Sequence, residues 1–249
     1  VGKMGSTLAG YHWWTFAAAC ALAFGNYSIR FFKWEFYLAR LEIRGIPKLD
    51  SYLTFFSGFV LTITPGKVGE VFKSVVLNET HGVPVAKTAP IVIAERVTDV
   101  IGIVVLIVLG SLGFSGGLKW AAIGTVLVLF LLVVIGSRTL SLGMIGLIEK
   151  MPGKIGALGP KLREAYESLA VMLQIRNLAL PTLLSIVAWL CECLALWIIL
   201  QGFGESTSVP LAVFFYATST LVGAIIPSPG GLGVTESALM GQMTELGHV

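Results

Sequence analysis

The chain has 249 residues, of which 55% are hydrophobic and only 12% are charged, and its mean hydropathy is +0.86. Soluble domains carry about a quarter charged residues, so this composition excludes a soluble globular protein. The formal net charge of +3 is mild, and in a membrane protein basic residues report on cytoplasmic loops rather than on nucleic acid. The long apolar runs are rich in Leu and Ala and lack period-2 alternation, which excludes a transmembrane β-barrel and predicts an all-α polytopic membrane protein.

The chain begins with one predicted span and a broken apolar segment. The span covers residues 11–29. The next apolar run, 51–63, is shorter than the roughly 20 residues that cross a bilayer, and a Pro-Gly pair at 65–66 ends it. A second short run, 68–77, follows at once. This pattern predicts a re-entrant hairpin over 51–80 that enters and leaves the membrane on the same side; a single kinked spanning helix is the alternative.

Two further spans and a long polar region follow. Residues 89–114 and 120–136 are apolar over a full spanning length, and a tight, uncharged turn joins them. The polar region 137–177 contains an amphipathic pattern after Pro160, a residue that suits the first turn of a helix. We expect a cytoplasmic loop whose helix lies on the membrane surface; a soluble amphipathic hairpin is the alternative.

The last part of the chain repeats the broken pattern. A span is predicted at 178–200, and Glu192 in its middle must be paired or protonated there. The apolar run 210–226 leads into a second Pro- and Gly-rich break, so residues 210–249 are predicted to form a second broken hairpin. Because the chain starts with Val and stops soon after a helix begins, we expect 1–249 to be a single transmembrane domain and a fragment, truncated at both ends.

Lys and Arg residues indicate the orientation. Residues 30–50 hold five of them and residues 137–177 hold six, whereas the loops at 115–118 and 202–209 hold none. The positive-inside rule places the two basic stretches in the cytoplasm. The chain then crosses the membrane three times between the two breaks. Because three is odd, the first break is approached from the cytoplasm and the second from outside, which relates them as an inverted pair. The prediction is an inverted-topology repeat with two broken or re-entrant helical hairpins.

Helix breaks within a membrane expose backbone groups that can bind a ligand. A helix that starts within the membrane presents free N–H groups and a partial positive charge, and both suit a phosphate. Lys67 adds a full positive charge at the start of the helix that follows the first break. Glu70 and Glu236 lie in the predicted opening turns, where ordinary helix capping is the alternative. The residues predicted to break the helices are Pro65, Gly66, Gly69, Pro227, Pro229, Gly230, Gly231 and Gly233.

A second cluster reads Glu95-Arg96-x-x-Asp99. Glu95 and Asp99 are four residues apart and would repel, so a cation is needed between them: Arg96, a basic group from elsewhere, or a proton. An internal ion pair is one interpretation, and a lipid-phosphate or proton site is the other. Arg30, Lys33 and Trp34, where the first span ends, are interpreted as snorkelling side chains and an aromatic belt at the membrane surface, and a head-group role is the alternative. The predicted lipid head-group site comprises Lys67, Glu70, Glu95, Arg96, Asp99, Glu236 and Arg30.

Three of these blocks and an early helix carry a family resemblance. They read Pro-Gly-Gly-Leu-Gly-x-x-Glu at 229–236, Pro-Gly-x-x-Gly-Glu at 65–70, Glu-Arg-x-x-Asp at 95–99 and Asn-Tyr-x-x-Arg-x-x-Lys-Trp at 26–34. The chain resembles the lysylphosphatidylglycerol synthase transmembrane (flippase-like) family over most of its length, with Lys33 where arginine is more usual. The resemblance implies an inner-membrane protein whose relatives move aminoacylated phospholipid between leaflets, and further helices beyond both ends. Lipid aminoacylation is not implied, because no soluble aminoacyl-transferase domain is present in the sequence.

These features predict a lipid transporter or flippase for a phospholipid or another phosphate-containing lipid. The alternatives are the membrane part of a lipid-modifying enzyme, such as an aminoacyl-phospholipid synthase or a glycosyltransferase, and a lipid-binding partner of such an enzyme. The predicted partners are a membrane phospholipid, a separate lipid synthase and a second copy of the chain in a homodimer, without nucleic acid. No catalytic residue, metal site or cofactor is predicted, because the three histidines are far apart and no catalytic spacing is present.

Overall fold

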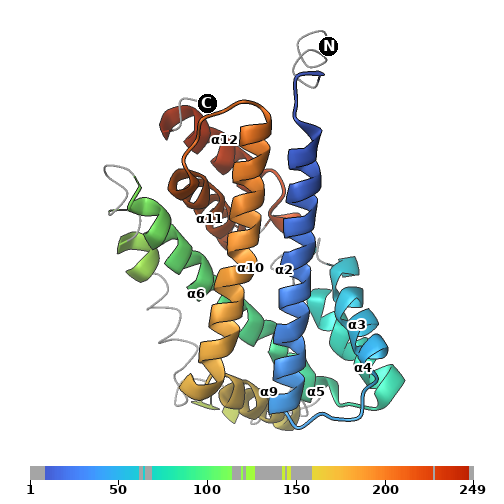
Figure 1. The fold of residues 1–249 in the computed structure, drawn as a ribbon. Helices are drawn as coiled ribbons and strands as arrows, with labels where there is room; N and C mark the ends of the chain where they lie inside the picture. The colour runs from blue at the N-terminus through green and yellow to red at the C-terminus, as the bar shows by residue number, and fades with distance from the viewer. Residues whose placement is uncertain are drawn as a thin grey trace. The chain divides into compact units, whose positions relative to one another are not determined.

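The computed structural model describes residues 9–61, 64, 69–113, 119, 122–126, 142–143, 145–146, 159–226 and 228–246. The elements within these ranges are helices, as the composition predicts (Figure 1). Most of the predicted span 120–136 and the first half of the loop 137–177 lie outside the described residues. In chain order the elements are α2 (Trp13–Arg40), α3 (Lys48–Ser57), η1 (Gly58–Leu61), α4 (Phe72–His81), α5 (Val85–Thr88), α6 (Pro90–Ser111), α9 (Gly159–Met172), α10 (Ile175–Gly202), α11 (Val209–Ile225), η4 (Pro229–Gly231) and α12 (Val234–Leu246).

The chain divides into two compact units. Unit 1 comprises residues 1–30, 100–125 and 184–249, and unit 2 comprises residues 31–99 and 126–183. The first predicted break therefore belongs to unit 2 and the second to unit 1. Helices α2, α6 and α10 contribute residues to both units.

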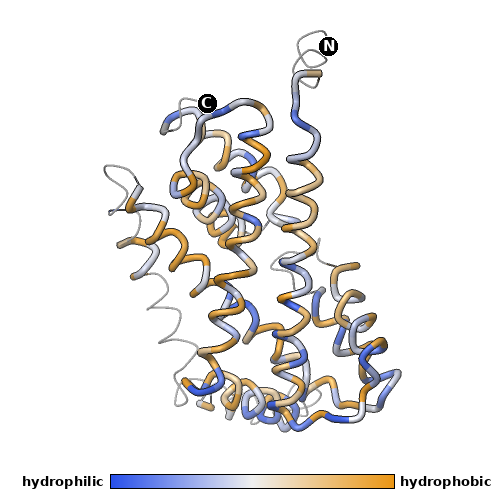
Figure 2. Tube along the Cα trace, in the orientation of Figure 1, coloured by the Kyte–Doolittle hydropathy of each residue, from blue (hydrophilic) through white to orange (hydrophobic). Residues whose placement is uncertain are grey.

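Two described helices are strongly apolar. By length and composition, α10 is the one helix among the described residues that is able to cross a membrane, and α11 is a shorter apolar helix. Figure 2 shows hydrophobic residues along most of both. They correspond to the predicted spans 178–200 and 210–226. The predicted spans 11–29 and 89–114 correspond to α2 and α6, which carry charged residues.

Helix α2 continues well past its predicted end at residue 29 and runs to Arg40. The charged residues there do not end the helix, because Arg30 and Lys33 are buried, with exposed fractions of 8% and 1%. The snorkelling interpretation of Lys33 is therefore wrong. Trp34 is also fully buried, and its Nε1 donates a hydrogen bond to Ser51 Oγ at 3.1 Å.

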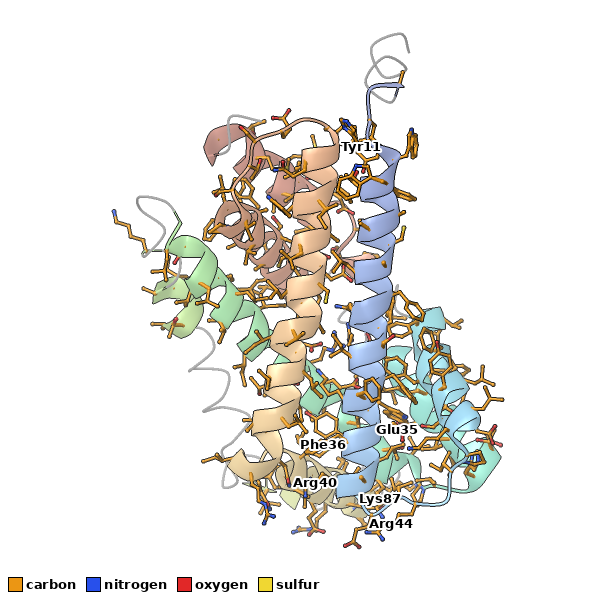
Figure 3. All side chains as sticks on the ribbon, in the orientation of Figure 1. Tyr11, Glu35, Phe36, Arg40, Arg44 and Lys87 are labelled. Atoms are coloured by element: carbon orange, nitrogen blue, oxygen red, sulfur yellow. The ribbon has the colours of Figure 1, made fainter. Side chains whose placement is uncertain are left out.

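The basic residues of 30–50 thus divide into two groups. Arg40 and Arg44 are exposed, and they lie at the same end of unit 2 as Lys87 (Figure 3). Lys48 is exposed as well and pairs with Glu35. This end of unit 2 matches the basic stretch that the positive-inside rule assigns to the cytoplasm.

Glycine allows close helix packing within unit 1. A Cβ atom at Gly110 of α6 would lie 2.8 Å from the backbone N of Phe214 and from the carbonyl O of Pro210, both in α11. A Cβ atom at Gly102 would lie 3.1 Å from the backbone N of Ile186 in α10. Small residues at such contacts let helix backbones approach in membranes, where van der Waals packing drives association.

The second break folds α12 back along α11 (Figure 1). Gly231 and Gly233 have φ values of +77° and +81°, a backbone region that favours glycine. Helix α12 begins slightly later than the predicted start near residue 232, because these two glycines are still part of the turn. Thr218 of α11 donates a hydrogen bond to Gln242 Oε1 of α12 at 2.7 Å, which ties the two helices together.

The first break joins α3 and η1 to α4, and α3 and α4 pack against each other. The α-helix begins at Phe72, after a single 3-10 turn, and not near residue 68 as predicted. Helices α3 and α4 have 10 residues each, so each is about 15 Å long, half of a bilayer core of about 30 Å.

Most of the predicted helix-breaking residues lie between helices. Pro229, Gly230, Gly231 and Gly233 lie between α11 and α12, and Gly69 lies between η1 and α4. The other three, Pro65, Gly66 and Pro227, lie outside the described residues.

Unit 2 has a continuous apolar core. Its fully buried members include Trp34, Tyr37, Leu77, Ile91 and Met172, which come from α2, α4, α6 and α9. Burying each such side chain contributes about 1.5–3 kcal/mol. The helix predicted after Pro160 is confirmed as α9, and its apolar residues join this core. The place of α9 on the membrane surface stays a prediction.

Candidate lipid head-group site

Six buried or half-buried charged side chains meet in unit 2, and we call them the charge network. Helix α2 supplies one of them, α4 and the turn before it supply two, and α6 supplies three. Among the described residues the network contains three cations and three anions, so its formal charge is zero. Its members are Lys33, Glu70, Lys73, Glu95, Arg96 and Asp99.

The first ion pair joins α2 to α6. Lys33 Nζ lies 2.6 Å from Asp99 Oδ1, and both side chains are at most 4% exposed. The same ammonium donates to Thr98 Oγ1 at 3.0 Å and to the carbonyl O of Glu95 at 3.4 Å. Three acceptors around one ammonium satisfy its three N–H donors, which a buried lysine requires.

The second ion pair joins α4 to α6. Lys73 Nζ lies 2.6 Å from Glu95 Oε2, and both side chains are at most 3% exposed. The ammonium also lies 4.8 Å from the centroid of a Trp34 ring and 5.6 Å from that of the Phe55 ring. Aromatic faces attract a cation electrostatically, and more strongly where water is excluded. Lys73 is therefore held by a carboxylate and two rings at once.

Arg96 forms the third and most open part of the network. Its Nη2 lies 3.1 Å from Glu70 Oε2 and 3.4 Å from Asp99 Oδ2. Its side chain is 26% exposed, against 5% for Glu70 and 4% for Asp99. Its buried Nε has no hydrogen-bond partner among the described residues. A guanidinium has five N–H donors, so Arg96 retains donors for an additional anion.

This arrangement answers the question that the sequence left open about Glu95 and Asp99. The cations between these carboxylates are basic groups from elsewhere: Lys73 for Glu95, and Lys33 for Asp99, in addition to Arg96. Both lysines are missing from the predicted site. A signal for Lys73 was available, because it follows Glu70 by three residues and so shares its helical face.

Glu236 belongs to unit 1, whereas the charge network belongs to unit 2. It is exposed, and its Oε2 accepts a hydrogen bond from the backbone N–H of Gly233 at 2.7 Å. This contact is helix capping, the alternative left open by the sequence.

We therefore expect a small effect from Glu236→Ala. The loss of one capping hydrogen bond should lower the free energy of unfolding by about 0.5–2 kcal/mol. The thermal midpoint of the purified protein in mild detergent measures this change. A loss of lipid binding with an unchanged midpoint would contradict the capping role and restore Glu236 to the head-group site.

Arg30 belongs to unit 1 and precedes Lys33 of the charge network by three positions in α2. Its Cζ lies 6.0 Å from the centroid of the Trp189 ring.

Glu192, in the middle of α10, accepts a hydrogen bond from the Tyr216 hydroxyl at 3.3 Å. Tyr216 is thus a hydrogen-bond partner of Glu192. Lys67 lies outside the described residues.

Other ligand chemistry has little support within the described part of the chain. No group of three or more His, Cys, Asp or Glu residues there is arranged to hold a metal ion. Cys20, Cys191 and Cys193 are free thiols. The charge network is therefore the strongest candidate site that the described residues offer.

Comparisons with known proteins agree with the resemblance noted in the sequence. The family model described as the lysylphosphatidylglycerol synthase TM region matches residues 1–248. A UPF0104 membrane protein of Methanocaldococcus jannaschii is 25% identical over 191 residues, which cover 73% of this chain and 77% of the relative. A UPF0104 membrane protein of Methanothermobacter thermautotrophicus is 22% identical over 263 aligned positions, which cover 94% of this chain and 74% of the relative. No solved structure matches the chain.

Proposed function

We propose that this chain binds phosphate-containing lipids and moves their head groups between the leaflets of the membrane. The chain belongs to the lysylphosphatidylglycerol synthase TM region family of integral membrane proteins. One observation carries the proposal, and it concerns Arg96, which lies inside a predicted span. Two carboxylates hold Arg96, yet about a quarter of its side chain stays exposed. Its Nε has no hydrogen-bond partner among the described residues. Arginine binds phosphate through two parallel N–H donors.

The rest of the charge network supports this role of Arg96. A charged group in a membrane is costly and persists mainly where it serves a function or is fully paired. Lys33 and Lys73 are closed by short ion pairs, so they hold α2, α4 and α6 around the site. Arg96 is the member that remains able to exchange a protein carboxylate for a ligand phosphate.

The two helix breaks support movement of the lipid as well as binding. One break lies in each unit, and in each unit two helices fold back beside one another. The proposal includes that these hairpins are re-entrant and related as an inverted repeat, an arrangement that transporters use for alternating access. Glu70, at the first break, connects that hairpin to Arg96.

A leaflet-resolved transport assay tests the proposal. Purified protein is reconstituted into vesicles with fluorescent phosphatidylethanolamine or phosphatidylglycerol, and the outer-leaflet label is quenched over time. The test variant is Arg96→Gln with Glu70→Gln, which removes the phosphate contact but keeps the formal charge of the network at zero. We expect its transport rate to fall at least about tenfold, which corresponds to about 1.4 kcal/mol in the barrier.

The matched control is Arg163→Gln with Glu167→Gln, two exposed residues of α9 in the same unit. It also removes one cation and one anion, and we expect its transport rate to equal that of the wild type. Wild-type transport by the Arg96 and Glu70 double variant would contradict the proposal. Lipid binding without any transport by the wild type would instead identify the chain as a lipid-binding partner of another enzyme.

A further inference from the structure

We infer that Glu192 of α10 is a reversible proton-binding site in unit 1, and that this proton is the coupling ion for lipid movement. The coupling rests on the proposed function, whereas the binding of the proton does not. Helix α10 supplies none of the six residues of the charge network, so this site is a second one. The position of Glu192, the partner of its carboxylate and the charge on a neighbouring helix carry the inference.

Glu192 lies in the middle of a strongly apolar helix. Helix α10 is long and apolar enough to cross a membrane, and Glu192 is its one carboxylate. The side chain is half-buried. An ionisable residue inside a span is costly, and such residues often mark the pathway of an ion or a proton. The position of Glu192 is therefore that of a functional carboxylate.

The partner of this carboxylate is a phenol. The hydroxyl of Tyr216 in α11 donates a hydrogen bond to Glu192 Oε2 at 3.3 Å. A phenolic hydroxyl donates to a carboxylate and accepts from a carboxylic acid, so it suits both protonation states. The lysines that pair with Glu95 and Asp99 have donors only, so they suit the ionised state alone. Glu192 can thus gain and lose a proton without losing its partner.

Arg30 of α2 offsets the cost of an ionised Glu192. Its positive charge acts on Glu192, and its Cζ lies 6.0 Å from the centroid of the Trp189 ring. Trp189 and Glu192 are three residues apart and so share a face of α10. Burial disfavours the ionised carboxylate, whereas Arg30 and the Tyr216 hydroxyl favour it. Because these effects oppose each other, both protonation states are accessible.

The remaining titratable groups around this carboxylate are thiols and phenols. Cys191 and Cys193 flank it in α10 and are free thiols. Tyr27 of α2 acts electrostatically on Tyr216. Residues 100–111 of α6, which belong to the same unit, include no Asp, Glu, His, Lys or Arg. Thiols and phenols titrate in the alkaline range, so in neutral and acidic buffer the carboxyl group is the one that titrates.

Helix α2 links proton binding to the charge network. Arg30 precedes Lys33 by three positions, less than one helical turn, and Lys33 pairs with Asp99 at 2.6 Å. When Glu192 takes up a proton, Arg30 loses one negative charge that attracts it. The electrostatic force on this turn of α2 then changes, and the same turn carries Lys33.

The first test measures how a proton gradient distributes the lipid. Vesicles that contain the purified full chain and fluorescent phosphatidylglycerol receive a gradient of about one pH unit, while a potassium ionophore holds the membrane potential at zero. With one proton for each lipid, we expect a leaflet ratio of the label of about ten at steady state. Quenching of the outer leaflet measures the ratio, and protein-free vesicles give the background. Equal distribution by a transporting wild type would overturn the inference.

Two variants assign the coupling to Glu192. Glu192→Gln should distribute the label equally between the leaflets, because an amide does not titrate. Glu245→Gln is the matched control, since it removes an exposed carboxylate of α12 in the same unit, and it should keep the wild-type ratio. A folded Glu192→Gln variant with the wild-type ratio would overturn the inference. A ratio that follows a sodium gradient instead would overturn the proton as the ion.

Infrared difference spectroscopy tests proton binding without transport. The full chain in mild detergent is moved from mildly alkaline to mildly acidic buffer, and we expect the carbonyl band of a protonated carboxyl group to appear. The band should be lost in Glu192→Gln and shifted in Tyr216→Phe, which removes the hydroxyl and keeps the ring. The second variant keeps the test decisive where Glu192→Gln does not fold. Absence of the band, or an unchanged band in Tyr216→Phe, would overturn the inference.

The outcomes separate the inference from the proposed function. Transport by the wild type without a response to the proton gradient would overturn the inference and leave the proposed function standing. No transport by the wild type would contradict the proposed function and, with it, the coupling. The infrared band then decides by itself whether Glu192 binds a proton.

Discussion

Replacement of Lys73 by methionine is expected to lower the free energy of unfolding by about 3–5 kcal/mol, the cost of removing one partner of a buried ion pair. The variant removes the ammonium that lies 2.6 Å from Glu95 Oε2 in a site that is at most 3% exposed. It also removes the cation that faces Trp34 and Phe55. The thermal midpoint of the purified protein in mild detergent, followed by tryptophan fluorescence, measures the loss.

A double variant shows whether the pair is the cause. Lys73→Met with Glu95→Leu removes both charges, and replacing a buried ion pair by apolar residues of similar size is often neutral or stabilising. We therefore expect the double variant to recover most of the lost stability. The control Lys161→Met changes an exposed residue of α9 and should shift the free energy of unfolding by no more than about 0.5 kcal/mol. A double variant as unstable as Lys73→Met would show that the two residues do not act as a pair.

The second large effect is expected from Gly69→Ala at the first break. A Cβ atom there would lie 2.3 Å from the carbonyl O of Leu61, 2.5 Å from Leu61 Cβ and 2.8 Å from Thr64 Oγ1. The backbone carbonyl cannot rotate away as a side chain does, and Thr64 Oγ1 is also the acceptor for the Gly69 N–H at 2.7 Å. Overpacking of this kind costs about 1–3 kcal/mol, so the thermal midpoint should fall.

Gly25→Ala provides the matched control for this change. Gly25 lies within α2, and a Cβ atom there meets nothing within 4 Å. Alanine is favoured over glycine in a helix by about 0.8–1.0 kcal/mol, so Gly25→Ala should raise the midpoint slightly. Because Gly69 precedes Glu70, Gly69→Ala should also weaken lipid binding, whereas Gly25→Ala should not. A fall of the midpoint with Gly25→Ala equal to that with Gly69→Ala would contradict the steric explanation.

Much of the fold and part of the site could be predicted from the sequence. Long apolar runs without period-2 alternation predict helices directly, because a helix makes all of its backbone hydrogen bonds within the segment that crosses the bilayer. The Glu95-Arg96-x-x-Asp99 spacing indicated a charged cluster on one helix, and helical geometry requires a counter-charge there. Pro and Gly marked both breaks, and at the second break Gly231 and Gly233 adopt positive φ. Local chemistry decides each of these features.

The identity of the counter-charges depended on contacts between distant parts of the chain. Lys33 and Asp99 are separated by 66 positions, and Lys73 and Glu95 by 22. No periodicity predicts such a pair, because it depends on how α2 and α4 pack against α6. The same is true of Glu236, whose pattern fits both a ligand site and a helix cap; the structure shows the capping contact, at 2.7 Å from the backbone N of Gly233.

The sequence by itself determined the helical membrane class and the two breaks, because composition and local backbone preference set these features, and its motifs carried the family resemblance. The tertiary structure decided which charges meet. It buried Lys33 and Lys73 against carboxylates of α6 and left Arg96 partly exposed between Glu70 and Asp99. The physical reason is that a buried charge must find a counter-charge in space, and packing rather than sequence spacing brings that partner within reach.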